Sequence, residues 1–458
     1  MKNCYARFSR DGTRKQYLSE HLNEVAGLSA EFSCYKNISK LVGVLHDLGK
    51  ATADFQKYLN DDRKRGSVVH AMQGAFIIDD MMHDSSDNAG VLAKEIASLV
   101  IASHHGSLSD GISPDGATVF FNKFAEKGSE KYSYNDVKQN ATDLFPSLEY
   151  DISSLQILAT QDTRSILCLI DNTYCDCESK YFALGLFIKY IYSCLIDADR
   201  LSALSFDMNE KRVLEIWKPK IIDWNSLIDT FENGIQQTYK ESVLRFGSES
   251  GIVRIRQDVS NRCKEACTKK TGIYKLSVPT GGGKTLSSLR FALHHCKEKK
   301  KKRIIYVIPY LSIIDQTALE FRKVMNLPKT NEIILEHHSN LIPPDDENES
   351  TRQIRELATS RWDKPIIITT MVQFLETVMS AKGGDLRKFH NMADSVIIFD
   401  EIQSLPIKTI NLFNEVVSFL AKLCDDTILL CTATQPQLEK TERENLLLER
   451  GMRTKTWT

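Results

Sequence analysis

Histidine and aspartate side chains suited to metal binding are spread over the first two hundred residues of this chain. His46 and Asp47 are adjacent in the segment LVGVLHDLGK. An imidazole and a carboxylate side by side can ligate one first-row divalent ion if a helix end holds them in place. A His-Asp pair alone is a weak signal because it also occurs by chance. It gains weight from further candidate ligands in segments expected to be helical: His21, His70, His104, His105 and Asp199.

Two positions near this set leave alternatives open. Asp197 lies two residues before Asp199 and competes with it for the same role as a ligand. Lys50 follows the His-Asp pair, where it is as well explained by an exposed charge as by a contact with phosphate.

A glycine-rich loop in the second half of the chain predicts a phosphate-binding site. The loop has the sequence PTGGGKT and contains Gly281, Gly282, Gly283, Lys284 and Thr285. Glycines allow a phosphate to approach the backbone N–H groups, and the following helix adds positive potential at its N-terminus. The lysine would reach the β- and γ-phosphates of a nucleotide, and the threonine would hold magnesium. The sequence therefore predicts an ATP site.

A pair of carboxylates ends a later apolar run. Asp400 and Glu401 follow SVIIF, which predicts a buried β-strand. Ligands of open α/β sheets bind at the carboxyl ends of the strands. We therefore expect Asp400 to assist magnesium binding and Glu401 to act as a catalytic residue that orients or deprotonates water.

The spacing of apolar residues divides the chain into two kinds of structure. Apolar residues recur every three or four positions through residues 1–215, which predicts an all-α domain with a long exposed excursion at 108–150. Residues 216–250 are more polar and are interpreted as a connector. From residue 251 onward, short apolar strands alternate with helices, which predicts an α/β lobe with a mainly parallel sheet at 251–458.

Composition sets further bounds on function. The formal net charge is −1, so binding of nucleic acid must rely on local patches. Eleven scattered cysteines without a CxxC pair favour a reduced, cytoplasmic protein over a disulfide framework. The N-terminus lacks the apolar core of a signal peptide. The sequence contains no run of 18 apolar residues, so no membrane-spanning helix is expected.

The order of motifs in the second half resembles a superfamily 2 helicase. VIPYLSIIDQ and TTMVQFLETV are similar to conserved helicase segments, and DEIQ takes the place of the DEAD box. The resemblance implies DNA contacts by Thr369, Thr370 and Gln373. It also implies coupling roles for Gln403, Thr432 and Thr434. Gln257 resembles the glutamine that reads adenine, although an exposed glutamine explains it equally well.

The histidines and aspartates of the first half resemble the HD phosphohydrolase superfamily. The resemblance implies a first divalent transition-metal ion held by His21, His46, Asp47 and Asp199. His70, His104 and His105 would then hold a second ion, with Asp47 as a catalytic residue. Two ions about 3.5–4 Å apart can activate water and stabilise the leaving oxygen of a phosphodiester.

The two resemblances together identify the chain as a member of the CRISPR-associated nuclease-helicases of type I systems. The segments HDLGK, HHG, DADR, PTGGGKT, DEIQ and TATQP occur in the order expected for that family. Membership implies degradation of single-stranded invader DNA with divalent metal and magnesium-ATP. It also implies recruitment by an RNA-guided surveillance complex, with no membrane partner.

A helicase of this kind needs a second RecA-like lobe, and only 24 residues follow Thr434. We therefore expect a truncated or split enzyme that binds ATP weakly and does not translocate alone, unless a separate second lobe supplies the missing part. Two alternatives remain open. One is an HD nucleotide phosphohydrolase regulated by ATP, and the other is an inert chain that only docks on partners.

Overall fold

The chain forms two compact units. The computed structural model describes residues 4–9, 12–60, 68–82, 87–111, 113, 115–207, 222–248, 250–328, 332–337, 360–433 and 456–457. Unit 1 comprises Met1–Asp171, Leu184–Lys218 and Ser380–His390. Unit 2 comprises Asn172–Ala183, Pro219–Met379 and Asn391–Thr458. The units therefore do not follow the expected boundaries, because each takes in a segment that is remote in sequence.

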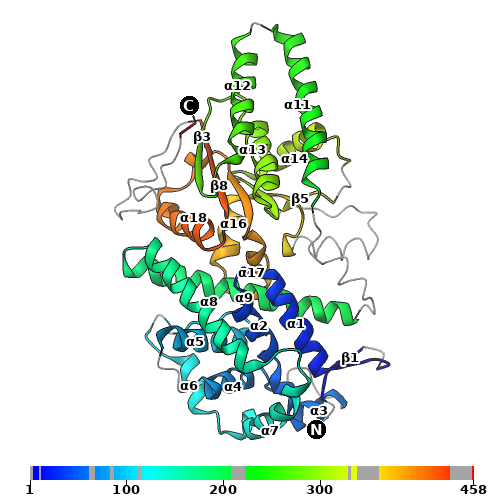
Figure 1. Ribbon diagram of the computed structural model, residues 1–458, viewed down its shortest axis with the longest axis vertical. Coiled ribbons are helices and arrows are strands. Elements are labelled where there is room, and N and C mark those ends of the chain that lie inside the picture. The colour runs from blue at the N-terminus through cyan, green and yellow to red at the C-terminus, as the bar shows by residue number, and fades with distance from the viewer. Residues whose placement is uncertain are drawn as a thin grey trace. The chain divides into compact units, whose positions relative to one another are not determined.

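Unit 1 is mostly helical, with one short antiparallel hairpin near the N-terminus. The hairpin strands are β1 (Tyr5–Phe8) and β2 (Lys15–Tyr17). Its early helices are α1 (Leu18–Phe32), α2 (Lys36–Leu45), α3 (Ala53–Asn60), α4 (Gln73–Met81) and α5 (Asn88–Ser103). Its later helices are α6 (Val119–Ala125), α7 (Tyr134–Leu144), α8 (Ile152–Thr173), α9 (Cys177–Asp207, within the unit from Leu184) and α17 (Gly383–Leu386). In Figure 1, α1, α4 and α5 lie around α2.

Helices α1 and α2 pack at very short range, and this contact fixes the geometry of the metal-ligand candidates. A Cβ atom added at Gly43 would lie 2.7 Å from the Cα atom of Ala26, so only glycine allows this approach. The apolar faces of both helices are buried, including Leu22 and Val42, because their apolar residues recur at helical spacing. His21 on α1 and His46 at the end of α2 are consequently neighbours.

The described part of 108–150 has few buried residues, as expected of an exposed excursion, but it is partly helical. This stretch contains α6 and α7, and both are anchored by buried side chains. Phe120, Tyr132 and Val137 are at most 2% exposed. The rings of Phe120 and Tyr132 pack against Phe124 and Phe76 respectively. Polar residues dominate the sequence here, but widely spaced aromatic residues supply the packing.

Unit 2 contains a seven-stranded sheet in the order β5-β6-β4-β7-β8-β3-β9. The strands are β3 (Ile273–Ser277), β4 (Arg303–Ile308), β5 (Ile334–His337), β6 (Ile366–Thr370), β7 (Ser395–Phe399), β8 (Thr427–Thr432) and β9 (Thr456–Trp457). Every described pairing in this sheet is parallel. The predicted fold class, a helical domain followed by a parallel-sheet lobe, is confirmed.

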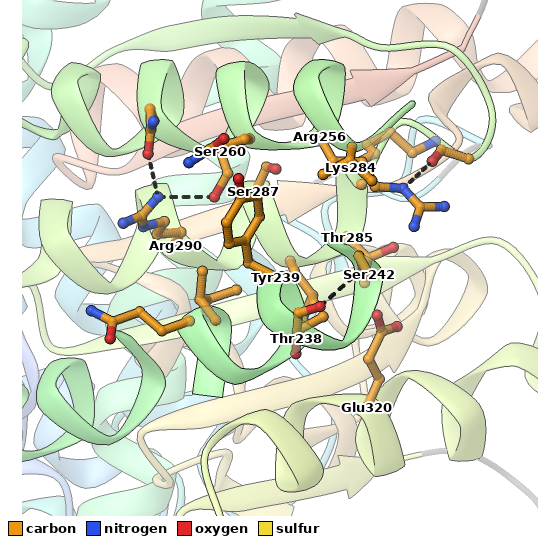
Figure 2. Close-up of a pocket in the computed structure, with 18 of the residues that line it drawn as sticks. Thr238, Tyr239, Ser242, Arg256, Ser260, Lys284, Thr285, Ser287, Arg290 and Glu320 are labelled. Carbon is orange, nitrogen blue, oxygen red and sulfur yellow. Dashed lines mark hydrogen bonds between the residues drawn. The ribbon is translucent and has the colours of Figure 1, made fainter. Parts of the chain in front are cut away.

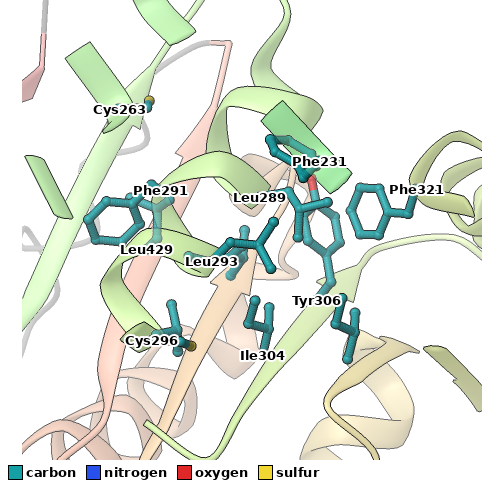
Figure 3. Close-up of a cluster of buried hydrophobic side chains, with 14 of the residues drawn as sticks. Phe231, Cys263, Leu289, Phe291, Leu293, Cys296, Ile304, Tyr306, Phe321 and Leu429 are labelled. Atoms are coloured by element: carbon teal, nitrogen blue, oxygen red, sulfur yellow. The ribbon is translucent and has the colours of Figure 1, made fainter. Parts of the chain in front are cut away.

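Helices cover the sheet of unit 2. They are α11 (Trp224–Phe246), α12 (Gly251–Glu265), α13 (Lys284–Lys299), α14 (Ile314–Val324), α16 (Met371–Met379) and α18 (Ile410–Leu423). Residues of α11, α13, α14 and the strands form one buried hydrophobic cluster (Figure 3). Trp224 and Phe231 of α11 belong to it, so the expected connector at 216–250 supplies a core helix to unit 2.

One helix is long and apolar enough to pass a length-and-composition test for a membrane span. It is α9, and 67% of its most apolar window is buried inside the protein. Core helices of soluble proteins pass the same test. Because most of this apolar window is packed inside the protein, its composition does not by itself indicate a membrane span.

Candidate metal centre and nucleotide site

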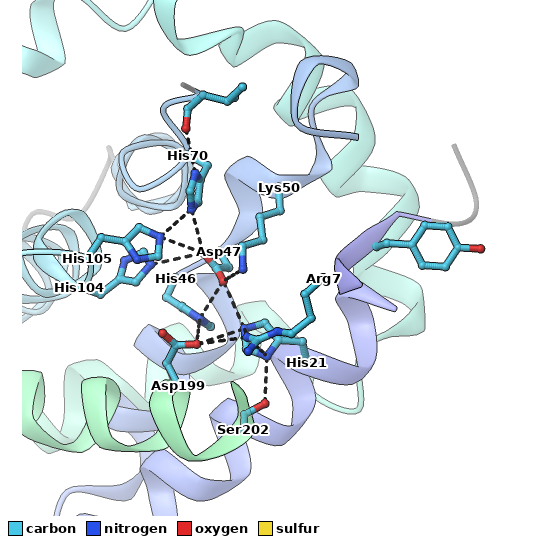
Figure 4. A network of polar contacts seen from close by, with 12 residues as sticks. Arg7, His21, His46, Asp47, Lys50, His70, His104, His105, Asp199 and Ser202 are labelled. Atoms are coloured by element: carbon cyan, nitrogen blue, oxygen red, sulfur yellow. Dashed lines mark hydrogen bonds and ion pairs between the residues drawn. The ribbon is translucent and has the colours of Figure 1, made fainter. Parts of the chain in front are cut away.

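Asp47 lies at the middle of the metal-ligand candidates in unit 1 (Figure 4). It follows the end of α2 and is fully buried. Its Oδ2 atom lies 3.2 Å from Nε2 of His21 and 3.3 Å from Nε2 of His46. Its Oδ1 atom lies 3.3 Å from Nε2 of His104 and 3.7 Å from Nε2 of His105. The two oxygens of this carboxylate therefore face two separate groups of histidines.

The ligand atoms fall into two sets that share Asp47. Atoms of His21, His46, Asp47 and Asp199 all lie within 4.8 Å of one another. Atoms of Asp47, His70 and His105 form the second such set. His104 adjoins the second set through its contact with Asp47. The structure thus brings together all seven residues that the sequence singled out, from segments far apart in the chain.

Backbone carbonyls fix which nitrogen of each histidine faces the centre. Nδ1 of His46 lies 2.7 Å from the Gly43 carbonyl, and Nδ1 of His104 lies 2.6 Å from the Ile101 carbonyl. A carbonyl oxygen can only accept, so Nδ1 carries the proton and Nε2 presents its lone pair. Both histidines follow helix ends, where carbonyls lack intrahelical partners. Nδ1 of His70 donates in the same way to the Val68 carbonyl.

His21 is oriented by side chains instead. Its Nδ1 atom lies 3.0 Å from Oγ of Ser202, and that hydroxyl donates to Oε2 of Glu24 at 2.6 Å. The serine proton is therefore committed to Glu24, so the serine accepts from Nδ1 of His21. Sequence reasoning missed this pair, although Ser202 follows Asp199 by three residues on α9 and Glu24 follows His21 by three on α1. Such spacings place side chains on one helix face.

Burial and charge keep His21, His105 and Asp47 in the forms that bind metal. Burial, assisted by Arg7, lowers the pKa of His21 to about 3, and burial likewise lowers that of His105 to about 3. Burial would raise the pKa of Asp47, but Lys50 and His46 hold it well below its usual range. Neutral imidazoles and ionised carboxylates are the forms that metals require.

His46 differs from the other histidines. Burial would lower its pKa, but Asp47 and Asp199 outweigh burial and raise the pKa to about 9. Its Nε2 atom is buried and makes no hydrogen bond within the part of the chain that the structure describes. The Nε2 atoms of His70 and His105 lie only 2.6 Å apart. Nε2 of His70 presents a lone pair, because Nδ1 of the same ring carries the proton. One positive ion beside His46 and a second between His70 and His105 would satisfy these atoms, so the residues fit divalent metal.

A cationic side chain also belongs to this centre. Nζ of Lys50 lies 2.5 Å from Oδ2 of Asp47, and Lys50 is 7% exposed. The structure therefore places this lysine in the centre rather than at the surface. Asp197, the competitor for Asp199, is committed elsewhere: it forms an ion pair with Arg387 and lies 3.5 Å from His390.

The glycine loop of unit 2 connects β3 to α13. Gly281 and Gly283 have φ angles of 79° and 82°, which favour glycine, and a Cβ atom at Gly282 would lie 2.5 Å from Val278. Nζ of Lys284 pairs with Oδ1 of Asp400 at 3.0 Å and with Glu401. The loop lysine therefore faces the carboxylates at the end of β7.

A cavity of about 760 Å³ opens beside this loop, within unit 2 (Figure 2). Its size lies within the range of about 300–1,000 Å³ that is typical of small-ligand sites. Its lining includes Gly281, Gly283, Lys284, Thr285, Asp400, Glu401 and Gln257. Tyr239 of α11 and Arg256 of α12 also line it, and neither was expected from the sequence. Nε of Arg256 donates to the Gly281 carbonyl at 2.8 Å and so braces the loop.

The residues expected to couple nucleotide to DNA are partly brought together. Nε2 of Gln403 donates to Glu401, and Oγ1 of Thr432 donates to Oε1 of Gln403 at 2.6 Å. This chain of contacts joins the ends of β7 and β8. Thr434, the third residue expected here, lies outside the described residues.

The expected DNA-binding residues lie around the start of α16. Thr369 is fully buried, and its hydroxyl donates to the His337 carbonyl at 3.0 Å. Thr370 is 6% exposed, and its hydroxyl accepts from the backbone N–H of Gln373 at 3.1 Å. Gln373 is the only one of the three residues that is not buried. A DNA contact by these residues stays a prediction.

The fold and the two sites define a helical HD domain joined to a DEAD/DEAH box helicase domain. The HD domain family matches residues 18–140, and the DEAD/DEAH box helicase family matches residues 258–441. The chain is similar to the CRISPR-associated nuclease/helicase Cas3 of Haloferax volcanii, with 22% identity over 449 residues. That match covers 89% of this chain and 46% of the relative, so the chain spans about half of the relative's length.

Solved structures show the same fold. The crystal structure of T. fusca Cas3-ATP matches with a TM-score of 0.59 and 18% identity, over 100% of this chain and 52% of that one. A chain of a CRISPR RNA-guided surveillance complex, pre-nicking, matches with a TM-score of 0.52 and 14% identity, over 97% of this chain and 48% of that one. The predicted resemblance to CRISPR-associated nuclease-helicases is confirmed at the level of domains and fold.

Proposed function

We propose that this chain is a metal-dependent nuclease that cleaves single-stranded DNA in CRISPR type I defence, in the cytoplasm. The bridging position of Asp47 between two sets of ligand atoms carries the proposal. Paired metal sites of this kind suit phosphodiester cleavage. The similarity to Cas3 supports DNA as the substrate, and the likeness to a chain of a surveillance complex supports such a complex as the partner.

Seven residues would hold the metal. One ion would be held by His21, His46 and Asp199, and a second ion by His70, His104 and His105. Asp47 would bind both ions. Bound divalent metal supplies an activated water and stabilises the leaving oxygen of a phosphodiester. The chain itself keeps Asp47 ionised, so this carboxylate is available to accept a hydrogen bond from water at the centre.

Unit 2 would bind magnesium-ATP through the glycine loop. Lys284 would exchange its carboxylate partners for nucleotide phosphate, which frees Asp400 to assist magnesium and Glu401 to orient water. The contacts of Gln403 with Glu401 and Thr432 give a route by which hydrolysis moves the strand ends. The chain spans about half the length of its relatives, and full translocation is proposed to require a second helicase lobe.

The proposal is tested with the full chain stripped of metal and reloaded with Mn²⁺. A labelled single-stranded oligodeoxynucleotide should be cleaved by the wild type and not by Asp47→Ala. The control is Asp54→Ala, which removes an exposed aspartate of α3 and should cleave normally. Cleavage that persists in Asp47→Ala contradicts the proposal.

Two further arms of the same experiment decide between the alternatives. Release of phosphate from free nucleotides without DNA cleavage favours a nucleotide phosphohydrolase. Binding to a surveillance complex by a chain that takes up no Mn²⁺ favours an inert docking protein.

A further inference from the structure

Arg7 places a permanent positive charge against the metal-ligand atoms, and no sequence motif pointed to it. It lies on β1, whose pairing with β2 is irregular between Tyr5 and Arg7. Its Nη2 atom lies 3.2 Å from Nε2 and 3.3 Å from Nδ1 of His21, and 3.5 Å from Oδ1 of Asp199. Figure 4 shows the side chain reaching from the strand to these two residues. Arginine stays charged at any pH that a folded protein experiences.

The contact with His21 does not use the arginine's donors well. Nearly equal distances from Nη2 to both ring nitrogens mean that Nη2 is not aimed along the lone pair of Nε2, and Nδ1 carries a proton. Both nitrogens also have nearer or equal partners, since Nδ1 lies 3.0 Å from Ser202 and Nε2 lies 3.2 Å from Asp47. The guanidinium is therefore held near the ring by charge and packing more than by a directed hydrogen bond.

The remaining donors of Arg7 are underused. Its Nε atom is buried and has no hydrogen-bond partner among the residues that the structure describes. Among the residues that the structure describes, the one ion pair of Arg7 is with Asp199, over a long N–O distance of 3.5 Å. A buried guanidinium donor without a partner costs free energy, so it favours any acceptor that reaches it.

The atoms nearest to Arg7 are the same atoms that would ligate a metal ion. Nε2 of His21 and Oδ1 of Asp199 belong to the first ligand set. An ion that takes these lone pairs leaves the guanidinium without them and repels its charge. The pairing of β1 with β2 restrains the backbone, so we expect the side chain to respond.

We propose that Arg7 binds the phosphodiester of the substrate at the metal centre. With metal bound, the guanidinium exchanges Asp199 for a phosphate oxygen, an anion that its fork of donors matches. Lys50 pairs with Asp47, so a second cation contacts the other carboxylate of the first ligand set. Arg7 thus becomes a substrate-binding residue whose phosphate site forms only when metal is present. This inference rests on the proposed nuclease function.

The test compares Arg7→Ala and Arg7→Lys with the wild type in the full chain. The matched control is Lys15→Ala, which removes the same charge from an exposed position on the same hairpin. Calorimetry measures Mn²⁺ affinity, and then inorganic phosphate affinity of the Mn²⁺-loaded protein. Hydrolysis of bis(p-nitrophenyl) phosphate gives kcat and KM separately. Circular dichroism verifies that each variant is folded.

We expect Arg7→Ala to bind Mn²⁺ at least as tightly as the wild type, because a competing cation has been removed. Its phosphate affinity should fall about 10- to 100-fold, as for loss of a hydrogen bond between charged groups. KM should rise by a similar factor, Arg7→Lys should recover part of the loss, and Lys15→Ala should change neither.

Two results would overturn the assignment. One is unchanged phosphate affinity in Arg7→Ala, and the other is a loss of Mn²⁺ affinity large enough to explain the loss of phosphate. If the wild type binds phosphate through Arg7 but cleaves no diester, the arginine assignment stands and the proposed nuclease function fails.

Discussion

The metal-ligand groups of unit 1 and the nucleotide cavity of unit 2 both hold lysines against carboxylates, but their burial differs. The side chains of Asp47 and Lys50 are 0% and 9% exposed, whereas those of Asp400 and Glu401 are 13% and 32% exposed. In unit 1, histidine lone pairs fixed by backbone carbonyls converge before any ligand binds. In unit 2, Lys284 and the carboxylates neutralise one another until a phosphate separates them.

This difference shows two ways to prepare a site for a charged ligand. In the metal centre, converging lone pairs destabilise the folded protein, and a cation is needed to satisfy them. In the nucleotide site, the lysine and the carboxylates neutralise one another in an ion pair. The nucleotide supplies an anion for the lysine, and its magnesium ion supplies a cation for the carboxylates. The first kind of site should respond strongly to loss of one ligand atom, and the second more weakly.

The largest expected effect is at the shared carboxylate of unit 1. Loss of a residue that hydrogen-bonds to a metal ligand typically lowers metal affinity about 10- to 100-fold. Asp47→Asn removes a ligand itself and should lower Mn²⁺ affinity by more than that. Nucleotide affinity should not change, because Asp47 belongs to unit 1 and the cavity to unit 2. Calorimetry with Mn²⁺ and with magnesium-ATP measures both. A fall in ATP affinity of similar size would break the comparison.

Core packing of unit 2 gives the next largest effect. Phe231→Ala should destabilise unit 2 by about 3–5 kcal/mol, because this ring is fully buried. Phe246→Ala, on the same helix but 48% exposed, should change stability by less than about 0.5 kcal/mol. Urea unfolding followed by fluorescence of bound nucleotide measures both. Equal effects would argue that α11 is a connector after all.

The loop lysine tests the nucleotide site. Lys284→Ala should lower ATP affinity about 10- to 100-fold, since a hydrogen bond between charged groups contributes about 1.5–3 kcal/mol. Lys297→Ala, on the exposed end of the same helix, is the control. Titration with a fluorescent ATP analogue measures the affinities, and an unchanged value for the first variant would refute this assignment.

A smaller effect is expected at the serine that orients His21. Ser202→Ala removes the acceptor for Nδ1 of His21 and should lower Mn²⁺ affinity about 10-fold. Ser165→Ala, exposed on α8, should have no effect. If both variants bind Mn²⁺ equally, the histidine does not depend on this hydroxyl.

The smallest expected effect is a pH dependence in unit 2. Burial would raise the pKa of Glu232, but His294 and Arg290 hold it below its ordinary value of 4.5. A carboxylate with a lowered pKa in the folded state stabilises above its unfolded pKa, and this stabilisation is lost as pH falls below that value. Glu232→Gln should therefore lose less stability than the wild type between pH 6 and pH 3. Urea unfolding at several pH values measures the slopes, and parallel slopes would contradict this account.

The sequence was most informative where chemistry depends on residue type. The glycine loop, the Asp-Glu pair and the histidines each occur in a recognisable local pattern. As expected, the structure brings the loop to the Asp-Glu pair, and it brings the histidines to one another. It was least informative about packing at long range. The helices at 108–150 and the core role of α11 escaped notice because their buried aromatic residues are widely spaced among polar ones.

The amino-acid order alone determined which side chains carry charge and lone pairs, and most of the segments that form helices or strands. Only the tertiary structure decided that Asp47 faces both histidine groups, that Asp199 rather than Asp197 joins them, and that Arg7 reaches the same atoms. Such choices depend on the close approach of α1 to α2 and on the pairing of β1 with β2. Contacts between residues distant in the chain are set by packing of whole elements, which local sequence patterns do not encode.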